Sequence, residues 1–430
     1  MNRIYIIVFI SVLLLSSCYI TSPTSNQTGN QKANKTKAQA LYNPFIYRLH
    51  PEYFIYEQSP QKTVLYTKIY LSEIKFVPLG SRKKYSGKIN IEYRIYADAN
   101  TQQVLDSASA SFKVRKQPNQ NNIISYLQLK DYGREQYFLE IITTDVYRRA
   151  GVRTYIKVDK NNINSSQKFL VVSKKNNQVY FKNFFRPEHY FSIKHNPPVD
   201  SLYIKYYKKD VPMPYPPFSD KKRPNINTTP DSIWSVSGKE SFQFHEEKPG
   251  FYFIQVDTTQ PGGLPMLNPG PYFPYVKTSL DMVKPLQYLC SEEEYQELIN
   301  SSNKKLSVDR FWLDCAGDNT ARARELIRIY YNRTLYANVY FTSFTQGWRT
   351  DRGMIYIMFG PPKTVKNYPD REIWLYHDKL NFRVLQFVFK KVENSYTDND
   401  YVLERHIDFR SFWFQSIKSW REGKVYSVFQ

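Results

Sequence analysis

The sequence predicts a multidomain, mainly β protein in which two β-sandwich domains of immunoglobulin-like size precede an α+β domain with helices and a small antiparallel sheet. Three observations support this prediction. Apolar and polar residues alternate with a period of two from about residue 45 to 257, prolines and glycines then interrupt the pattern, and helical periodicity begins near residue 278. We therefore place the domains at 45–162, 163–258 and 278–430, with a linker at 259–277.

Residues 1–17 predict a signal peptide, because Arg3 precedes an apolar run that is too short to span a bilayer. Leu15-Ser16-Ser17-Cys18 resembles the lipobox of bacterial lipoproteins, which implies that Cys18 carries the lipid and that the mature chain begins there. Two or three acyl chains would anchor the protein stably, since each buried methylene contributes roughly 0.8 kcal/mol. The alternative is an ordinary signal peptide whose cysteine is incidental.

Residues 18–44 predict a flexible tether between the membrane and the first domain. Residues 21–40 are rich in Ser, Thr, Asn, Gln and Lys, so they cannot bury enough apolar surface to fold. No acidic cluster follows Cys18. In one Gram-negative phylum such a cluster marks export to the cell surface, so its absence favours an outer-membrane anchor that faces the periplasm.

The formal net charge of +21 restricts the partners. In a cytoplasmic protein this charge would indicate nucleic acid, but the export signal and the lack of a nucleic-acid-binding motif argue against it. An anionic lipid or glycan surface, such as lipopolysaccharide, or an acidic protein partner suits the charge and the compartment better. The alternative is that the basic residues are spread thinly and serve no particular partner.

The clearest predicted strand is Lys88–Ile95, in which residues 89, 91, 93 and 95 are apolar and the residues between them are polar. Residues 242–256 predict a hairpin that turns at Lys248-Pro249-Gly250. The Pro-rich stretch 211–217 predicts extended, stiff chain. Other predicted strands of the sandwiches are Thr63–Leu71, Ser111–Val114, Tyr137–Thr143, Lys168–Ser173, Leu202–Tyr206 and Phe242–His245.

The third domain begins with helix signals. Ser291-Glu292-Glu293-Glu294 is a capping box, Ser307 is placed to cap a second helix, and Thr320–Phe341 carries a long amphipathic pattern. Three strands and a last helix follow. The predicted strands are 372–377, 382–392 and 401–407, and the last helix places Phe409, Trp413, Ile417 and Trp420 on one side.

Several short motifs occur together in this domain. They are Tyr330, Asn332-Arg333, Tyr336-Ala337-Asn338, Phe344, Gly347-Trp348-Arg349-Thr350-Asp351-Arg352-Gly353, Tyr356, Gly360-Pro361-Pro362 and Glu372-Ile373-Trp374. Over about 280–420 the chain resembles the GWxTD domain, which is found in envelope lipoproteins and has no settled function. The resemblance supplies no catalytic residue that could be carried over.

The GWRTDRG segment has a structural interpretation. Gly347 would take a positive φ and end the preceding element, and Trp348 would pack its indole onto the helices. Thr350 and Asp351 would accept backbone N–H bonds in a tight turn that Gly353 closes. Residues 354–359 would then form a buried central strand.

The same segment has two functional interpretations. Gly347 to Gly353, including Arg352, could be a loop that binds a ligand or a partner. Alternatively Asp351 could act as a base beside a Thr350 nucleophile, with His377 nearby in the fold, although adjacent residues of a strand point to opposite faces. We favour the structural interpretation, since it gives every residue of the motif a physical role.

Two cysteines, Cys290 and Cys315, remain when Cys18 is assigned to the lipid. In an oxidising compartment they could form a disulfide that contributes roughly 3 kcal/mol, or they could stay buried free thiols. No Cys/His spacing resembles a metal site and no cofactor motif is present, so we expect neither a metal nor a cofactor.

Two function classes follow. The first is a non-enzymatic outer-membrane lipoprotein that acts as a scaffold or accessory subunit of an envelope complex for transport, secretion or assembly. The second is glycan binding or processing, since the 37 Tyr of the chain could stack on sugar rings. We rank the scaffold first, because the sequence offers no catalytic set.

Overall fold

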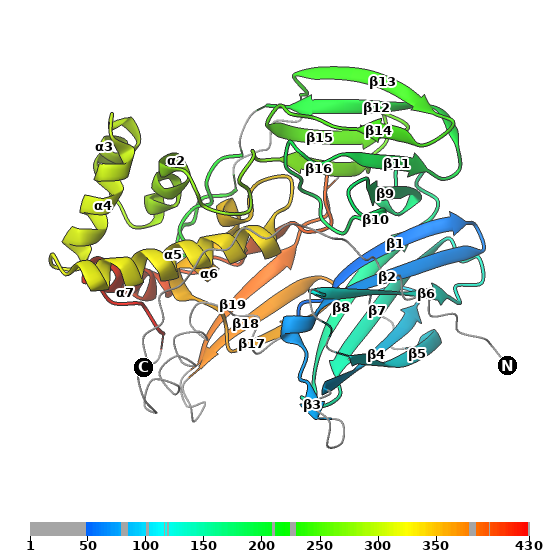
Figure 1. Ribbon diagram of the computed structural model, residues 1–430, viewed down its shortest axis with the longest axis horizontal. Helices are drawn as coiled ribbons and strands as arrows, with labels where there is room; N and C mark the ends of the chain where they lie inside the picture. The colour runs from blue at the N-terminus through cyan, green and yellow to red at the C-terminus, as the bar shows by residue number, and fades with distance from the viewer. Residues whose placement is uncertain are drawn as a thin grey trace.

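The computed structural model describes residues 49–78, 85–99, 103–115, 117, 120–208, 211–223, 229–377, 384–394 and 396–428. The predicted signal peptide, the tether and Cys18 lie outside the described residues. The chain is mainly β, with two sandwiches in contact with one another and a third, α+β domain beside both of them (Figure 1). Within the described part of the chain, no helix has the length and apolar character needed to cross a membrane.

The first sandwich packs a three-stranded sheet, β1-β2-β6, on a five-stranded sheet in which β4 pairs with β3, β5 and β7, and β7 pairs with β8. The predicted alternation is confirmed, since Ile89, Ile91, Tyr93 and Ile95 are all buried between the sheets. Its strands are β1 (Glu52–Ser59), β2 (Lys62–Tyr70), β3 (Val77–Pro78), β4 (Tyr85–Tyr96), β5 (Val104–Arg115), β6 (Asn122–Leu129), β7 (Gln136–Asp145) and β8 (Ala150–Asp159).

The second sandwich packs the sheet β10-β9-β11-β14 on the sheet β13-β12-β15-β16, around an aromatic-rich core. Its strands are β9 (Phe169–Ser173), β10 (Gln178–Val179), β11 (Phe191–His195), β12 (Val199–Tyr207), β13 (Ser232–Gly238), β14 (Phe242–Phe244), β15 (Gly250–Gln255) and β16 (Leu264–Asn268). The predicted 242–256 hairpin is wrong, because β14 pairs with β11 in one sheet and β15 pairs with β12 and β16 in the other. The turn at Lys248-Pro249-Gly250 therefore carries the chain from one sheet to the other.

The predicted linker at 259–277 is also wrong in part, because Leu264–Asn268 forms β16, an edge strand of the second sandwich. The sandwich therefore extends beyond its predicted end at residue 258. Only the remainder of the segment leads into the third domain, and proline at position 265 is tolerated because it lies in an edge strand.

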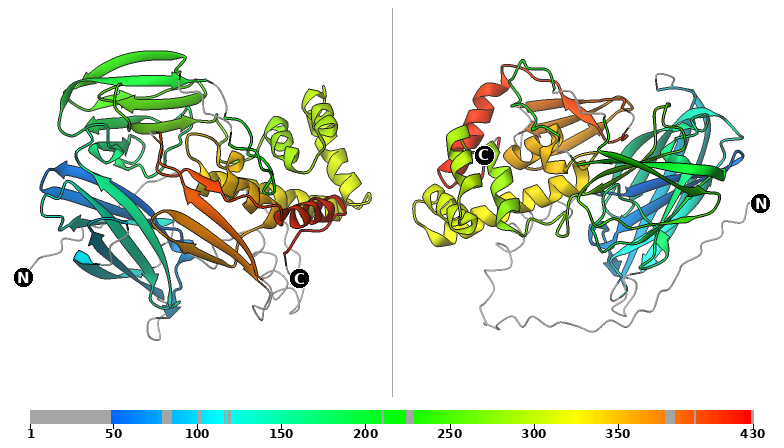
Figure 2. Two further views of the ribbon diagram at one scale, coloured as in Figure 1. Left: turned by 180° about the vertical axis from the view of Figure 1, so that it is seen from behind. Right: turned by 90° about the horizontal axis from the view of Figure 1, so that it is seen from above.

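The third domain packs helices on one face of the sheet β17-β18-β19-β20, and the sandwiches lie beside this domain, with Asn367 of β17 donating to the Arg153 carbonyl of β8 (Figure 2). Its helices are α2 (Ser279–Val283), α3 (Glu292–Asn300), α4 (Lys304–Cys315), α5 (Thr320–Phe341), α6 (Asp351–Phe359) and α7 (Phe409–Arg421), and its strands are β17 (Thr364–Asn367), β18 (Arg371–His377), β19 (Val384–Lys391) and β20 (Tyr401–Leu403). The predicted bounds of α5 and the capping box at Ser291 are confirmed. The cap of α4 is Asn303, not the predicted Ser307, because the Asn303 carboxamide accepts the N–H of Leu306.

Three interfaces join the domains. The sandwiches meet at a buried ion pair in which Lys168 Nζ lies 2.8 Å from a Glu57 carboxylate oxygen. The C-terminal end of α5 reaches the first sandwich, where Tyr340 stacks on His50 with ring centroids 4.6 Å apart. The outer face of β15 and β16 packs on the third domain through an aromatic cluster of Phe184, Tyr207, Phe251, Phe253, Leu267, Phe273 and Phe344, with Tyr396 against it. Because this last interface is apolar, it behaves as an extension of the core rather than as a linker.

Candidate functional site

The motif segment forms a short helix, not a strand. Residues 354–359 belong to α6, whose nine residues are all buried. The strand prediction failed because a short apolar run that is buried on all sides has no periodicity to distinguish helix from strand. A local signal was present, since Thr350 followed by Asp351 is an N-cap followed by a first-turn carboxylate.

Gly347 has a different role from the predicted one. It does not take a positive φ; it starts the short 3-10 helix η5 (Gly347–Arg349), which lies against the backbone of α5. A Cβ at this position would come within 2.0 Å of the Ala337 carbonyl oxygen. Gly353 is restricted in the same way, with a Cβ at 1.9 Å from the Gly347 oxygen. The two glycines therefore permit close contact between α5, η5 and α6.

Trp348 is buried as predicted, and Asn338 of α5 holds its backbone. The Trp348 N–H donates to Asn338 Oδ1 at 3.2 Å, and the Trp348 carbonyl accepts from the Tyr288 hydroxyl at 2.8 Å. The amide nitrogen Nδ2 of Asn338 donates to the Pro274 carbonyl at 3.1 Å. One buried side chain thus connects the motif to the chain segment that enters the third domain.

The Thr350 hydroxyl caps α6. It donates to the Gly347 carbonyl at 2.8 Å and accepts the Gly353 N–H at 3.0 Å. The N–H acceptance predicted for Thr350 is confirmed, although it opens a helix rather than a turn before a strand. Both hydrogen-bonding functions of the hydroxyl are therefore used within the motif.

The Asp351 carboxylate bonds to a distant part of the chain. It accepts the Leu403 N–H at 2.8 Å and pairs with the Arg405 guanidinium, whose Nη1 lies 3.1 Å away. Arg405 in turn donates to the Tyr215 carbonyl at 2.9 Å. This arrangement gives no support to a base beside a Thr350 nucleophile, because each of the two side chains is engaged by other partners.

Two further arginines, Arg352 and Arg333, link α6 to its surroundings. Arg352 is buried, pairs with Glu372 at 2.8 Å and lies over the Tyr401 ring at 4.0 Å. Arg333 Nη1 donates to the carbonyls of Ile357 and Met358, which are among the last of the helix. Burial lowers the pKa of Arg333 to about 10, so the guanidinium stays charged at neutral pH.

A known protein family matches the part of the chain that contains this motif. Residues 250–422 match the family model described as the GWxTD domain. The chain carries a GWxTD domain. No curated protein matches the chain. The match begins at Gly250, so it includes β15 and β16, the two strands of the second sandwich whose apolar face packs on the third structural domain, residues 278–430.

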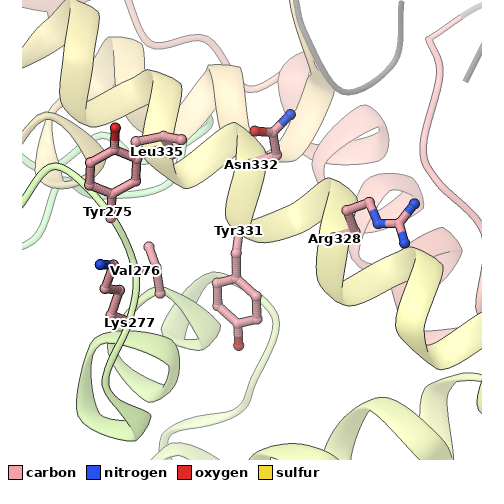
Figure 3. Close-up of a pocket in the computed structure, with 7 residues that line it drawn as sticks. All are labelled: Tyr275, Val276, Lys277, Arg328, Tyr331, Asn332 and Leu335. Carbon is pink, nitrogen blue, oxygen red and sulfur yellow. The ribbon is translucent and has the colours of Figure 1, made fainter. Parts of the chain in front are cut away.

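A hollow of about 520 Å³ lies on the surface of the GWxTD domain, between α5 and the segment 275–277. Figure 3 shows the side chains that line it: Tyr275, Val276, Lys277, Arg328, Tyr331, Asn332 and Leu335. No sequence signal identifies this hollow, since residues 275–277 belong to the predicted linker and Asn332 belongs to the family pattern and lies off the apolar stripe of the long helix. Within the described ranges, no group of three or more His, Cys, Asp or Glu side chains is placed to bind a metal ion.

The two cysteines of the GWxTD domain are free thiols, so the structure does not form the disulfide considered from the sequence. Cys315 is buried and Cys290 is half-buried. Burial raises the pKa of the Cys290 thiol to about 12 and that of the Cys315 thiol to about 11. Both are therefore poor nucleophiles at neutral pH.

Proposed function

We propose that the protein is a non-enzymatic scaffold or accessory subunit of an outer-membrane complex, anchored through lipid on Cys18 and facing the periplasm. The observation that carries this proposal is that the motif and its ion-pair partner bind a segment of the second sandwich and so join it to the GWxTD domain. The segment 211–223, which lies between β12 and β13 of the second sandwich, is held by Arg349 of the motif and by Arg405, the ion-pair partner of Asp351. Arg349 donates to the Val211 carbonyl and Arg405 to the Tyr215 carbonyl.

Further contacts strengthen the same junction. Arg223 binds Asp400 with one guanidinium nitrogen 2.9 and 2.8 Å from the two carboxylate oxygens, and the His406 N–H donates to the Pro217 carbonyl. These contacts, of which Arg349 supplies the one from the motif itself, hold the second sandwich and the GWxTD domain in one fixed arrangement. A fixed arrangement of three domains suits a protein that sets the position of its partners, whereas a catalyst would need reactive side chains left available.

The test is the native mass of the protein after gentle detergent extraction from its own membrane. A large stoichiometric complex with an integral membrane protein is the expected result. A lone monomer would overturn the obligate-subunit role and would favour the glycan-binding alternative.

The lipid anchor is tested separately by fractionation. We expect Cys18→Ala protein to leave the membrane fraction, whereas Cys290→Ala protein remains there, since only Cys18 follows the lipobox. Cys18→Ala protein that still sediments with the outer membrane would contradict the anchor while leaving the scaffold role open to the mass measurement.

A further inference from the structure

The hollow beside α5 lies between two separate segments of the chain. Arg328, Tyr331, Asn332 and Leu335 follow one another on a single stripe of α5, because they are spaced by three, one and three residues. Tyr275, Val276 and Lys277 form the opposite wall, on the segment that leaves the second sandwich (Figure 3). Its volume of about 520 Å³ lies in the range of small-ligand sites.

The charge of the hollow is of one sign. Lys277 and Arg328 are both exposed, and none of the seven lining side chains is acidic. Lys277 Nζ also lies 5.7 Å from the centroid of the Tyr275 ring, so the cation and the aromatic face are presented together. Such a lining favours a negatively charged ligand.

The remaining groups suit a sugar ring. The Tyr275 side chain is 51% exposed, which leaves a ring face for the C–H groups of a pyranose. Asn332 is a residue of the family pattern, and no hydrogen bond to its side chain is found within the part of the chain that the structure describes. Its carboxamide can donate to and accept from a sugar hydroxyl. Val276 and Leu335 supply a short apolar wall between these groups.

The hollow is held in shape by buried residues on both sides. The Pro274 carbonyl accepts the Asn338 carboxamide, and Phe273 packs against Phe184 with ring centroids 4.9 Å apart. On the inner side, the Tyr331 hydroxyl donates to the Met282 carbonyl at 3.0 Å. A ligand would therefore meet a wall that is already ordered, which reduces the entropy lost on binding.

We propose that this hollow binds an acidic saccharide, a pyranose ring that carries a carboxylate or a phosphate group. Lys277, which lies beside Tyr275, binds the anionic group, Tyr275 stacks on the ring, and Asn332 binds a hydroxyl (Figure 3). This site is independent of the scaffold role, because none of its lining side chains takes part in the junction between the motif and the segment 211–223.

The experiment uses the soluble Cys18→Ala protein and calorimetric titration with tetragalacturonate, with its fully methyl-esterified form as the neutral counterpart of equal length. Mannose 6-phosphate distinguishes phosphate from carboxylate as the anionic group. Lys277→Gln and Asn332→Leu are the site variants. Lys113→Gln is the matched control, because Lys113 is an exposed lysine on β5 of the first sandwich.

We expect at least one of the two anionic probes to bind, the neutral ester to bind at least tenfold more weakly, and binding to weaken as salt increases. Each site variant should lose about tenfold in affinity, the value of one hydrogen bond to a charged or polar ligand group, and the control should lose nothing. Three outcomes would overturn the proposal: no binding of either anionic probe, equal binding of the neutral ester, or full affinity in both site variants.

Discussion

Asp351, the first residue of α6, forms a buried ion pair with Arg405, which follows β20, and the two residues are 54 positions apart in the sequence. The side chains are 6% and 11% exposed. The same carboxylate accepts the Leu403 N–H, so one side chain fixes the start of the helix against the end of the sheet. Asp351 therefore joins the motif to β20 and to Arg405 through one hydrogen bond and one ion pair.

The first prediction concerns that pair. Asp351→Asn should destabilise the GWxTD domain by about 3 kcal/mol, because it leaves the Arg405 guanidinium buried without its counter-charge. The measurement is chemical unfolding followed by Trp fluorescence, which reports this domain because five of the six tryptophans lie in it. Asp309→Asn is the control, since it removes an exposed ion pair with Lys305 and should change stability by less than about 0.5 kcal/mol. Equal effects of the two changes would contradict the role assigned to Asp351.

The second prediction concerns the motif glycines. Gly347→Ala should destabilise the domain by more than about 4 kcal/mol, because the added methyl would meet the rigid backbone of α5. Gly317→Ala is the matched control: its φ is +57°, but a Cβ there has open space, so the change should cost only about 1 kcal/mol of backbone strain. Thermal unfolding of the two variants compares them. A Gly347→Ala protein as stable as Gly317→Ala would show that α5 and η5 can separate freely.

The sequence predicts the features of this structure that depend on neighbouring residues, but not those that depend on contacts between distant residues. The period-two pattern of β4, the bounds of α5 and the capping box at Ser291 were predicted correctly, because each depends on neighbouring residues. The hairpin at 242–256 was predicted wrongly, since the same turn residues serve a connection between two sheets. The roles of Gly347 and Asp351 depend on contacts with residues far along the chain, which no local pattern contains.

The third prediction tests the interface between the second sandwich and the GWxTD domain. Tyr396 contacts the rings of Tyr207, Phe251 and Phe253, with centroids 5.8, 5.8 and 5.0 Å away. Tyr396→Ala should weaken the interface by about 3 kcal/mol and split the calorimetric unfolding profile into separate transitions. Tyr368→Ala, at an exposed side chain next to β17, should leave the profile unchanged. A single unchanged transition in Tyr396→Ala protein would contradict a coupled junction.

The fourth prediction concerns the two thiols. At pH 8 the thiolate fraction of native Cys290 should be about a thousandfold below that of an ordinary thiol, because burial raises its pKa from 9.0 to about 12. Iodoacetamide should therefore modify neither cysteine of folded Cys18→Ala protein within hours, as mass spectrometry would show. In denaturant without a reductant, both should react. A failure to react in denaturant until a reductant is added would instead establish the disulfide.

The last prediction concerns Asn338, which joins the motif to the wall of the hollow. Asn338→Asp keeps an oxygen that can accept the Trp348 N–H, but it replaces the donor to Pro274 with a carboxylate oxygen that faces the carbonyl. We expect a loss of about 2 kcal/mol in domain stability, because the Pro274 carbonyl is left without its donor.

The same substitution should also displace the segment 275–277 and so weaken tetragalacturonate binding at the hollow, although Asn338 does not line it. Tyr288→Phe provides the comparison, since it removes the other bond to the Trp348 backbone without touching Pro274. It should cost a similar amount of stability and leave binding unchanged. If the two variants lost binding equally, the effect would come from general destabilisation of the domain, and Asn338 would have no specific role in holding the hollow open.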